Sequence, residues 1–479
     1  MADDHSGQLS TDAVGLAEAH RLFALQHAAS RTQAPPDLAA RLDALERLRR
    51  LITDNAAALK DAISEDFGVR SRAETQLLEI VPTLSAIRYA RRRLADWIKP
   101  RRQSVDLTFQ PAKAWVRHEP LGVVGIISPW NYPILLALSP LVDALAAGNR
   151  ALIKPSELTP AFCDLLSRLI SQSFAETELA VAVGGVEVAQ AFSSLPFDHL
   201  IFTGSTAVGR KVMQAAAANL TPVTLELGGK SPAVVLADYP LHKAARSIAF
   251  GKFVNAGQTC IAPDYVLVPK ASAHAFAQAV MTQARRSYPR IADNADYTSM
   301  ITQRHYDRLA QAIEAARASG ATVLTHEDAG VAAARKIGPT VVLDLPATSI
   351  LLTEEIFGPV LPIVAYDSLE DALDFINARD RPLALYAFTH NEQQHRRLLD
   401  GATSGGVTLN GTLLHIAQES LPFGGVGPSG IGAYHGYEGF CRFSHARSVH
   451  QIGAFNAFER IGPPWGLLAS VLARFLSRR

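Results

Sequence analysis

Cys260 and Glu226 are the two residues of this chain whose types and surroundings could do covalent chemistry. Cys260 ends a run of small and polar residues, and Glu226 stands close to a pair of glycines. A thiolate can attack an electrophilic carbon, and a carboxylate can later activate the water that releases the product. A cysteine taken alone is more often a small buried hydrophobe. Because Asn255, Gln258 and Thr259 are poor choices for a dry core, we expect the Cys260 site to be exposed.

The elements that must hold these two residues follow from the spacing of the apolar positions. The first hundred residues are typical of helices, one of which carries an apolar stripe at Leu42, Leu45, Leu48, Leu51 and Ile52. From residue 121 onward, short apolar runs alternate with helical segments, which predicts βαβ units and parallel sheets. The expected strands cover residues 121–128, 151–153, 199–202 and 223–227 in a first region, and 233–236, 265–268, 341–343, 360–364 and 385–388 in a second. The chain therefore predicts an α/β fold with a helical prefix and two α/β domains that meet near residue 231.

Composition narrows the class of protein. The 479 residues are 48% hydrophobic and 19% charged, which is ordinary for a large soluble enzyme of two or three domains. The formal net charge is +1, so we expect no nucleic-acid partner, for which a basic surplus is usual. Cys163, Cys260 and Cys441 lie too far apart to suggest a disulfide framework or a zinc site, so we expect no metal and a reducing, cytoplasmic setting. The first ten residues lack the apolar core of a signal peptide.

Polar residues and glycines at the expected strand ends suit a dinucleotide. In an open parallel sheet, ligands collect at the carboxyl ends of the strands. The strand at 199–202 runs into Gly204, Ser205 and Gly209, where free amides at a helix start could meet a phosphate, although a tight packing turn would give the same pattern. Lys154 and Glu157 follow another strand and suit ribose hydroxyls, with a surface ion pair as the alternative.

Asn131 follows a third expected strand, at the end of a run that begins at Ser128. Its side-chain amide could donate to an oxyanion that develops on a substrate. An asparagine that only forms a turn before a tyrosine and a proline is the alternative.

Five motifs of the chain resemble those of one family and occur in that family's order. They are Pro129-Trp130-Asn131-Tyr132-Pro133, Phe202-Thr203-Gly204-Ser205-Thr206, Glu226-Leu227-Gly228-Gly229-Lys230-Ser231-Pro232, Gly257-Gln258-Thr259-Cys260 and Glu355-Ile356-Phe357-Gly358-Pro359. Over about residues 41–445 the chain thereby resembles the NAD(P)-dependent aldehyde dehydrogenases. The resemblance implies a Rossmann-like parallel-sheet cofactor domain within residues 1–230, with an oligomerisation hairpin near 100–118. It further implies a catalytic domain at 231–430 and a C-terminal oligomerisation segment with an amphipathic tail at 431–479.

The same resemblance implies a role for each motif. Cys260 would attack an aldehyde, Asn131 would hold the oxyanion with the Cys260 amide, and Glu226 would activate the water that hydrolyses the thioester. The cofactor would be NAD, with NADP as the alternative. Its binding residues would be Ser128, Pro129, Trp130, Lys154, Glu157, Gly204, Ser205, Gly209, Leu227, Glu355 and Phe357.

Within the family the chain is similar to the class 3 branch, and its bacterial members that oxidise coniferyl aldehyde look most alike. The traits are Lys154-Pro155-Ser156-Glu157, Cys260-Ile261-Ala262-Pro263-Asp264-Tyr265, Leu421-Pro422-Phe423-Gly424-Gly425-Val426-Gly427 and Tyr434-His435-Gly436. This similarity implies a homodimer. The apolar and aromatic residues expected near the site favour a phenylpropenal such as coniferyl aldehyde, with medium- or long-chain fatty aldehydes as the alternative; they are Tyr132, Ile261, Leu413, Leu414 and His415.

The C-terminus predicts a short basic amphipathic helix. Its apolar residues Trp465, Leu468, Leu472 and Phe475 recur at helical spacing, and Arg478 and Arg479 follow. Such a helix could dock on the protein's own body or on a partner subunit, or lie on the inner membrane face. A different class of function, a non-redox thiol hydrolase or acyltransferase, would also use Cys260 but would leave the residues at the strand ends unexplained.

Overall fold

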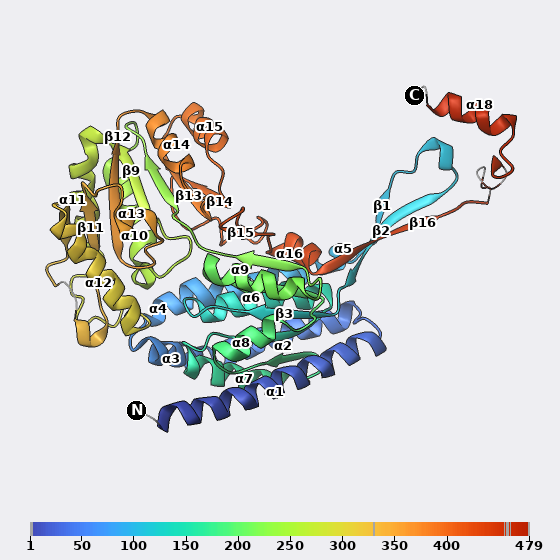
Figure 1. Cartoon of the computed structure of the whole chain (residues 1–479), viewed down its shortest axis with the longest axis horizontal. Coiled ribbons are helices and arrows are strands. Elements are labelled where there is room, and N and C mark those ends of the chain that lie inside the picture. Colours follow the sequence, from blue (N-terminus) through green and yellow to red (C-terminus); the bar gives the residue numbers. More distant parts are fainter. Residues whose placement is uncertain (1–2, 329–330, 455, 457–458, 460, 478–479) are drawn as a thin grey trace.

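The computed structural model describes residues 3–328, 331–454, 456, 459 and 461–477, and within them the strands form three sheets (Figure 1). A six-stranded and a seven-stranded sheet make up the body, and a three-stranded sheet projects from it as an arm. The helical prefix comprises α1 Asp3–Thr32, α2 Leu38–Asp54, α3 Ala56–Phe67, α4 Arg72–Thr75, a π-helical segment Gln76–Ile80 and α5 Val81–Trp97. The expected α/β class with a helical prefix is confirmed.

The six-stranded sheet has the order β15-β7-β6-β3-β4-β5 and is parallel except where β15 pairs with β7. Its strands are β3 Val123–Ile127, β4 Arg150–Lys154, β5 Leu179–Val181, β6 His199–Thr203, β7 Val223–Glu226 and β15 Gly430–Ile431. The connecting helices are α6 Pro133–Ala147, α7 Pro160–Ser173, α8 Val186–Ser193 and α9 Thr206–Ala217. The strands expected in this region are present, with ends shifted by no more than two residues.

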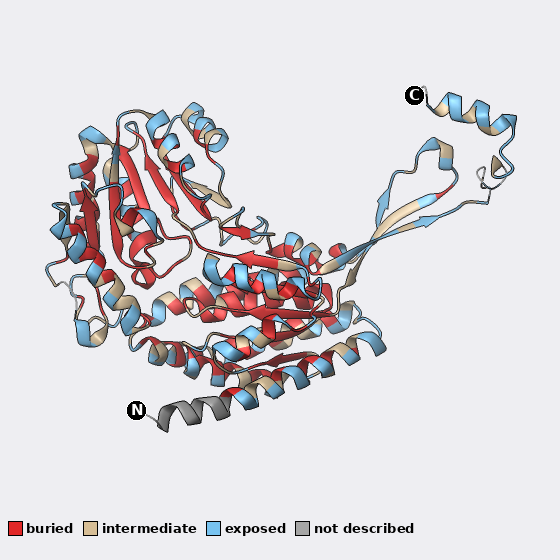
Figure 2. Cartoon of the chain, in the orientation of Figure 1, coloured by how far each residue is buried: buried red, intermediate tan, exposed pale blue. Residues whose placement is uncertain are grey.

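Both faces of the six-stranded sheet are buried. Val124 and Ile126 join a core with α2, α5, α6 and α7, whereas Val123 and Ile127 join a second core with α1, α8 and α9. Successive side chains of a strand point to opposite faces, so a strand that is covered on both sides must be apolar throughout. Figure 2 shows the resulting buried layer running through the sheet and the inner faces of its helices.

The seven-stranded sheet has the order β10-β11-β12-β9-β8-β13-β14 and is parallel except between β10 and β11. Its strands are β8 Pro232–Val235, β9 Tyr265–Pro269, β10 Thr322–Thr325, β11 Thr340–Leu343, β12 Val360–Tyr366, β13 Ala384–Phe388 and β14 Gly406–Leu409. Its helices are α10 Leu241–Phe253, α11 Ala273–Ser287, α12 Gln303–Ala318, α13 Ile350–Thr353, α14 Leu369–Asn377 and α15 Glu392–Gly401. The chain changes sheets between β7 and β8, and the division into functional domains at residues 230 and 430 stays a prediction.

The arm has the antiparallel order β1-β2-β16, with β1 Arg101–Gln103, β2 Lys113–Pro120 and β16 Ser444–Gln451. A hairpin therefore occupies the range in which one was expected, and the C-terminal strand completes its sheet. Before β16 the chain forms α16 Gly436–Arg442, which packs against α5 and α6.

The C-terminal helix α18, Leu467–Leu476, lies beyond the tip of the arm and away from the body (Figure 1). Four of its apolar side chains and the tryptophan just before it are between 57% and 86% exposed, namely Trp465, Leu467, Leu468, Val471 and Phe475. Docking on the protein's own body, one of the expected arrangements, is therefore wrong, because β16 runs out along the arm and carries the tail with it. Arg478 and Arg479 lie outside the described residues. In the part of the chain that is described, no helix is long and apolar enough to cross a membrane.

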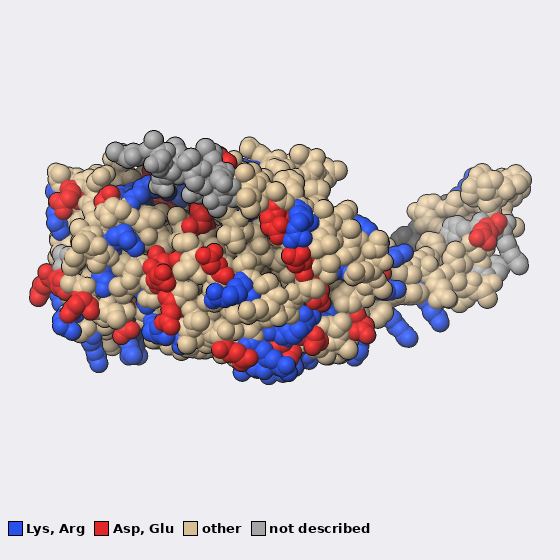
Figure 3. All heavy atoms as spheres, turned by 90° about the horizontal axis from the view of Figure 1, so that it is seen from below, with Lys and Arg blue, Asp and Glu red and all other residues tan. Residues whose placement is uncertain are grey.

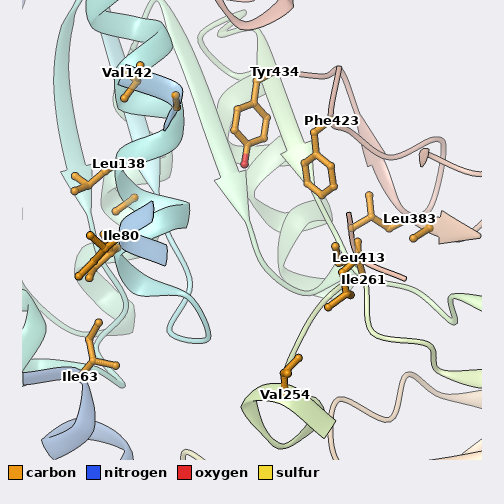
Figure 4. Close-up of a cluster of buried hydrophobic side chains, with 14 of the residues drawn as sticks. Ile63, Ile80, Leu138, Val142, Val254, Ile261, Leu383, Leu413, Phe423 and Tyr434 are labelled. Atoms are coloured by element: carbon orange, nitrogen blue, oxygen red, sulfur yellow. The ribbon is translucent and has the colours of Figure 1, made fainter. Parts of the chain in front are cut away.

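A single hydrophobic cluster joins the helical prefix to the second unit, which is the part of the chain built on the seven-stranded sheet. It extends from α2, α5 and α6 to the loop after α10, where Val254 and Ile261 are buried. Phe423 and Tyr434 of the C-terminal region, labelled in Figure 4, belong to the same buried cluster as Ile261. The segment around Cys260 is thus anchored in the main core. On the outside, basic and acidic side chains interleave over the face shown in Figure 3, in keeping with the near-zero net charge.

Candidate active site

A cavity of about 590 Å³ gathers most of the residues singled out from the sequence. It is lined by Pro129, Trp130, Asn131, Leu136, Thr203, Gly204, Ser205, Thr206, Ala207, Glu226, Gly228, Cys260, His305, Arg308, Glu354, Glu355 and Phe357. The first of these follow β3, β6 and β7, which are neighbours in the six-stranded sheet, and the rest come from the second unit. The carboxyl ends of parallel strands meet at one edge, which is where such sheets bind ligands.

Cys260 follows a short 3-10 turn, Val254–Gly257, that has left-handed backbone at three consecutive positions. The φ angle is 52° at Asn255, 50° at Ala256 and 73° at Gly257. A Cβ at position 257 would lie 2.2 Å from the carbonyl oxygen of Gly358, so only glycine fits there. Backbone held in this region costs on the order of 1–3 kcal/mol per non-glycine residue and is typical of functional sites.

The polar residues of this loop are buried, so the prediction of an exposed site is wrong for them. Asn255, Gln258 and Thr259 are at most 7% exposed. The Gln258 side chain makes three hydrogen bonds of 3.0 Å to main-chain groups, and the Thr259 hydroxyl lies 2.7 Å from the Tyr132 hydroxyl. Buried polar groups are tolerated when they are hydrogen bonded, so the polarity of this run reflects internal bonding and not contact with water. Cys260 itself is half-buried and lines the cavity.

The Cys260 thiol is held in its protonated form. Burial raises its pKa to about 12, and the negative charges of Glu355 and Glu226 contribute to the increase. Attack by this sulfur at neutral pH therefore requires a base that takes its proton. The two other cysteines lie elsewhere: Cys163 is buried in α7, and Cys441 lies at the root of the arm.

Asn131 lies against the loop that carries Cys260. Its Nδ2 donates to the Gln258 carbonyl oxygen at 3.2 Å, and the side chain is 3% exposed. An amide nitrogen carries two hydrogens, so one remains for an oxyanion that forms beside Cys260. This placement fits an oxyanion donor better than an asparagine that only forms a turn.

Glu226 ends β7 with a carboxyl group that makes no hydrogen bond to the described part of the chain. The residue is 2% exposed, and neither carboxyl oxygen is bonded to any described residue. Burial raises its pKa well above the ordinary value. Burying an unpartnered acid is costly, and a carboxyl whose pKa lies nearer neutrality suits proton transfer. The position therefore fits a general base.

The edge of the cavity near α9 has the features of a phosphate site. Ser205 caps α9, its Oγ accepting from the Val208 amide at 3.4 Å, so the first amides of a twelve-residue helix face this edge. Across the cavity the Trp130 ring packs against Phe357, with ring centroids 5.4 Å apart. A flat aromatic surface and a helix N-terminus suit the ring and phosphate parts of a nucleotide.

Five predicted cofactor residues do not line this cavity: Ser128, Lys154, Glu157, Gly209 and Leu227. Lys154 is buried at the end of β4, where its Nζ donates to the Pro155 carbonyl at 2.7 Å and lies 4.0 Å from Glu157. With the lysine only 1% exposed, the pair is not the surface ion pair of the alternative interpretation. Gly209 and Leu227 pack against each other, since a Cβ at 209 would lie 2.6 Å from a Leu227 methyl.

Comparisons with known proteins show the family of the chain. The sequence model of the aldehyde dehydrogenase family matches residues 9–449. The chain belongs to the aldehyde dehydrogenase family. It is 51% identical to the probable coniferyl aldehyde dehydrogenase of Pseudomonas aeruginosa, covering 93% of each chain, and 45% identical to the coniferyl aldehyde dehydrogenase of a Pseudomonas species, covering 87% of each. The solved structure of the substrate-bound state of Staphylococcus aureus AldH is 38% identical, with a TM-score of 0.89 over 95% of this chain and 99% of that chain.

This aldehyde dehydrogenase therefore uses NAD or NADP, as its family does, and the residues present fit such a cofactor. Gly228 leaves room that a side chain would fill, because a Cβ there would lie 2.2 Å from a carboxyl oxygen of Glu355. Burial raises the pKa of Glu355 to about 8. The alternative of a non-redox thiol hydrolase is wrong. Among the described residues, no group of His, Cys, Asp and Glu side chains could hold a metal ion.

Sequence reasoning missed a buried charge network behind Glu355. Lys230 pairs with Asp264 and donates to the Glu354 carbonyl at 2.8 Å, which fixes the segment that presents Glu355. Lys252 is fully buried, its Nζ has no hydrogen-bond partner in the described chain, and burial lowers its pKa to about 8. A lysine set among apolar residues of an expected helix was the available sequence signal. His305 and Arg308 also line the cavity, but no pattern in the sequence indicated them.

The residues expected around the substrate of the aldehyde dehydrogenase are partly brought together. Ile261 and Leu413 are buried in the same cluster, and the Tyr386 hydroxyl donates to the Ile261 carbonyl. His415 is held by a 2.9 Å contact between its Nδ1 and the Thr408 hydroxyl. Leu414, by contrast, is 60% exposed, so it does not belong to this buried wall.

Proposed function

We propose that this enzyme oxidises aromatic aldehydes of the phenylpropenal class, coniferyl aldehyde among them, through a covalent intermediate on Cys260. The observation that supports the proposal is one cavity lined by Cys260, Asn131 and Glu226 together. The substrate class rests on the relatives with 45% and 51% identity that are described as coniferyl aldehyde dehydrogenases.

The first step is attack by sulfur on the aldehyde carbon. Because burial raises the pKa of the thiol to about 12, the sulfur must give up its proton as it attacks, and that proton passes to the solvent. The oxygen of the resulting thiohemiacetal is held by the free hydrogen of Asn131 Nδ2 and by the Cys260 amide. These donors are fixed before the charge develops, so they stabilise the transition state without reorganisation.

Collapse of the thiohemiacetal expels a hydride, for which NAD(P) supplies the acceptor when bound, and leaves a thioester on Cys260. Glu226 then takes a proton from water, and that water attacks the thioester carbon. The carboxylic acid leaves and the thiol is restored. A carboxyl whose pKa is raised by burial holds a proton more readily than a free carboxyl group, which suits taking a proton from water and returning it to the departing thiolate.

For the cofactor, we infer that Gly204 and Ser205 hold the pyrophosphate and that Glu355 and Phe357 hold the nicotinamide end. Lys154 and Glu157 would bind the adenosine ribose, with Glu157 38% exposed and free to accept a hydroxyl. A carboxylate at that place repels a 2′-phosphate, which favours NAD over NADP. Comparing kcat/KM for NAD and NADP in wild type and Glu157→Gln tests this; an unchanged ratio would contradict it.

The substrate assignment is tested by comparing kcat/KM for coniferyl aldehyde, benzaldehyde, octanal and hexadecanal. We expect coniferyl aldehyde to exceed octanal by at least about tenfold, because the buried wall contains several aromatic rings. The reverse order would favour a fatty aldehyde, the second candidate, to which the exposed apolar face of α18 also points.

We infer that two copies form a homodimer through the arm, whose strands stand clear of the body (Figure 1). The apolar face of α18 would then contact the partner subunit or the inner membrane face of a cytoplasmic enzyme. Light scattering of the intact chain tests the dimer. Co-sedimentation with phosphatidylglycerol vesicles, with and without residues 465–479, separates the two sites for α18.

A further inference from the structure

Three charged side chains of the helical prefix lie beside the active site without taking part in the proposed chemistry, and two of them are buried. They are Arg70, Glu74 and Glu79, which lie just before and within α4 and the π-helical segment Gln76–Ile80. Arg70 is 1% exposed and Glu79 is fully buried. π-helical turns are rare and often occur at functional sites, and this one sets the register at which Glu79 points inward.

Arg70 reaches the main chain of the oxyanion donor. Its Nη1 donates to the Asn131 carbonyl oxygen at 2.7 Å, while its guanidinium lies 5.0 Å from the centre of the Tyr132 ring. The same carbonyl accepts from Asn255 Nδ2 at 3.0 Å. Asn131 is therefore held from the prefix on one side and from the cysteine loop on the other.

Glu79 contacts both Arg70 and the first turn of α6, the helix that follows Asn131. Its Oε1 lies 3.0 Å from Arg70 Nη2, and its Oε2 accepts from the amides of Ile134 at 2.8 Å and Leu135 at 3.3 Å. These amides belong to the first turn of α6, which has no side-chain cap of its own. The carboxylate thus fixes where α6 begins, immediately after the Asn131 turn.

Glu74 holds the loop that precedes Cys260. Its Oε2 accepts from the Asn255 amide at 2.9 Å and from the Thr298 hydroxyl at 3.2 Å. Asn255 is one of the left-handed residues of the cysteine loop, so this bond helps to hold a strained backbone. The prefix segment therefore contacts both loops that meet over Cys260.

We propose that Arg70, braced by Glu79, is a positioning residue that sets the Asn131 amide against Cys260. The inference rests on the proposed role of Asn131 as oxyanion donor. A buried ion pair contributes little net stability compared with apolar residues of equal volume, so a purely structural role would not require charges here. Movement of an oxyanion donor by a fraction of an ångström, in contrast, lowers turnover directly.

The test is a double-mutant cycle with Arg70→Met and Asn131→Ala, singly and together, measured as kcat and KM for a soluble aldehyde. Arg70→Met should lower kcat on the order of tenfold with KM changed by less than about twofold, because a transition-state interaction is misplaced. In the Asn131→Ala background the same substitution should change kcat by less than about twofold, since the group it positions is gone. An equal loss in both backgrounds, or no loss in wild type, overturns the inference.

Arg335→Met is the matched control. Arg335 also joins the prefix to the second unit through carbonyls, donating to Phe67 at 2.7 Å and Met300 at 2.8 Å, but it does not touch Asn131. Any effect of its loss should be the same in both backgrounds; an effect that vanishes with Asn131→Ala would show that the cycle reports general loosening and overturn the inference. If Arg70→Met does not fold, Arg70→Lys keeps the counter-charge for Glu79 and enters the same cycle with the same criteria.

The outcomes separate this inference from the proposed function. If Asn131→Ala alone leaves kcat unchanged, the oxyanion assignment fails and the positioning role fails with it. If Asn131→Ala lowers kcat by roughly 10²–10³-fold but the Arg70 loss is independent of it, the proposed function stands and only the positioning role is refuted.

Discussion

Replacing Glu226 by glutamine removes a carboxyl group that has no hydrogen-bond partner on either oxygen in the described chain. Glutamine has nearly the same shape, so the substitution breaks no bond and leaves no cavity. The substitution should therefore have two separate effects, one on catalysis and one on stability, and both arise because Glu226 is buried. Catalysis should suffer because the base is lost, and stability should improve because the folded protein no longer carries an acid that ionises more readily in the unfolded chain.

The kinetic loss should fall on hydrolysis of the thioester. A general base contributes about 10²–10⁴-fold, which corresponds to about 3–5 kcal/mol of barrier. Because Cys260 and Asn131 remain, the first turnover should still form one NADH per site before the steady rate falls by that factor. In wild type the hydrolytic step should accelerate as pH rises through the elevated pKa of Glu226, and the glutamine variant should lack this dependence.

The stability gain should grow with pH, and its sign follows from linkage. The pKa of Glu226 is raised in the folded state above 4.5, so between the two values the folded protein holds a proton that the unfolded chain has released. Wild type then loses about 1.4 kcal/mol per pH unit relative to the variant, until pH passes the folded pKa. Below pH 4.5 the two proteins should differ little through this group.

Rapid-mixing absorbance of NADH measures the burst and the steady rate, and thermal unfolding of both proteins at several pH values measures the stability difference. A steady rate within about tenfold of wild type, or a variant without a burst, would refute the role of Glu226 in hydrolysis. A difference in unfolding midpoint that stays constant from acid to neutral pH would refute the account of its buried charge.

Three further substitutions test other parts of the site, and a fourth, in the core, is a control. Asn131→Ala should lower kcat by roughly 10²–10³-fold in steady-state assays, and near-normal turnover would show that it is not an oxyanion donor. Gly228→Ala should raise KM for NAD on the order of tenfold, because its Cβ would lie 2.2 Å from a carboxyl oxygen of Glu355; an unchanged KM would mean that Glu355 does not hold the cofactor. Cys260→Ser should abolish NADH formation, whereas Cys163→Ala, a core change in α7, should keep kcat within about twofold while lowering the melting temperature.

The elements of both main sheets could be predicted because local pattern and tertiary role agree there. Val123 and Ile127 lie in a strand that is buried on both faces. Such a strand appears in the sequence as a continuous apolar run, so the local pattern was enough to predict it. The motif residues Asn131, Glu226 and Cys260 were likewise predictable, because each belongs to a short run with its own signature, and the structure places all three at one cavity.

The predictions that failed concern surroundings that no local window contains. The loop before Cys260 is polar, but its polar groups are satisfied inside the protein, so polarity did not mean exposure. The amphipathic pattern of α18 correctly predicts a helix, yet an apolar face does not say what will cover it. The arm that carries this helix away from the body is built from strands more than 300 residues apart in sequence.

The sequence by itself determined the alternation of strands and helices, and from it we predict the reacting groups and the sheet edge at which a cofactor can bind. Only the tertiary structure decided what surrounds those groups. Arg70 meets Asn131 across 61 residues, and Glu74 meets Asn255 across 181. Propensity and periodicity act over one or two turns of chain, whereas the burial that raises the pKa of Glu226 and the bonds that place Asn131 arise only when distant segments pack together.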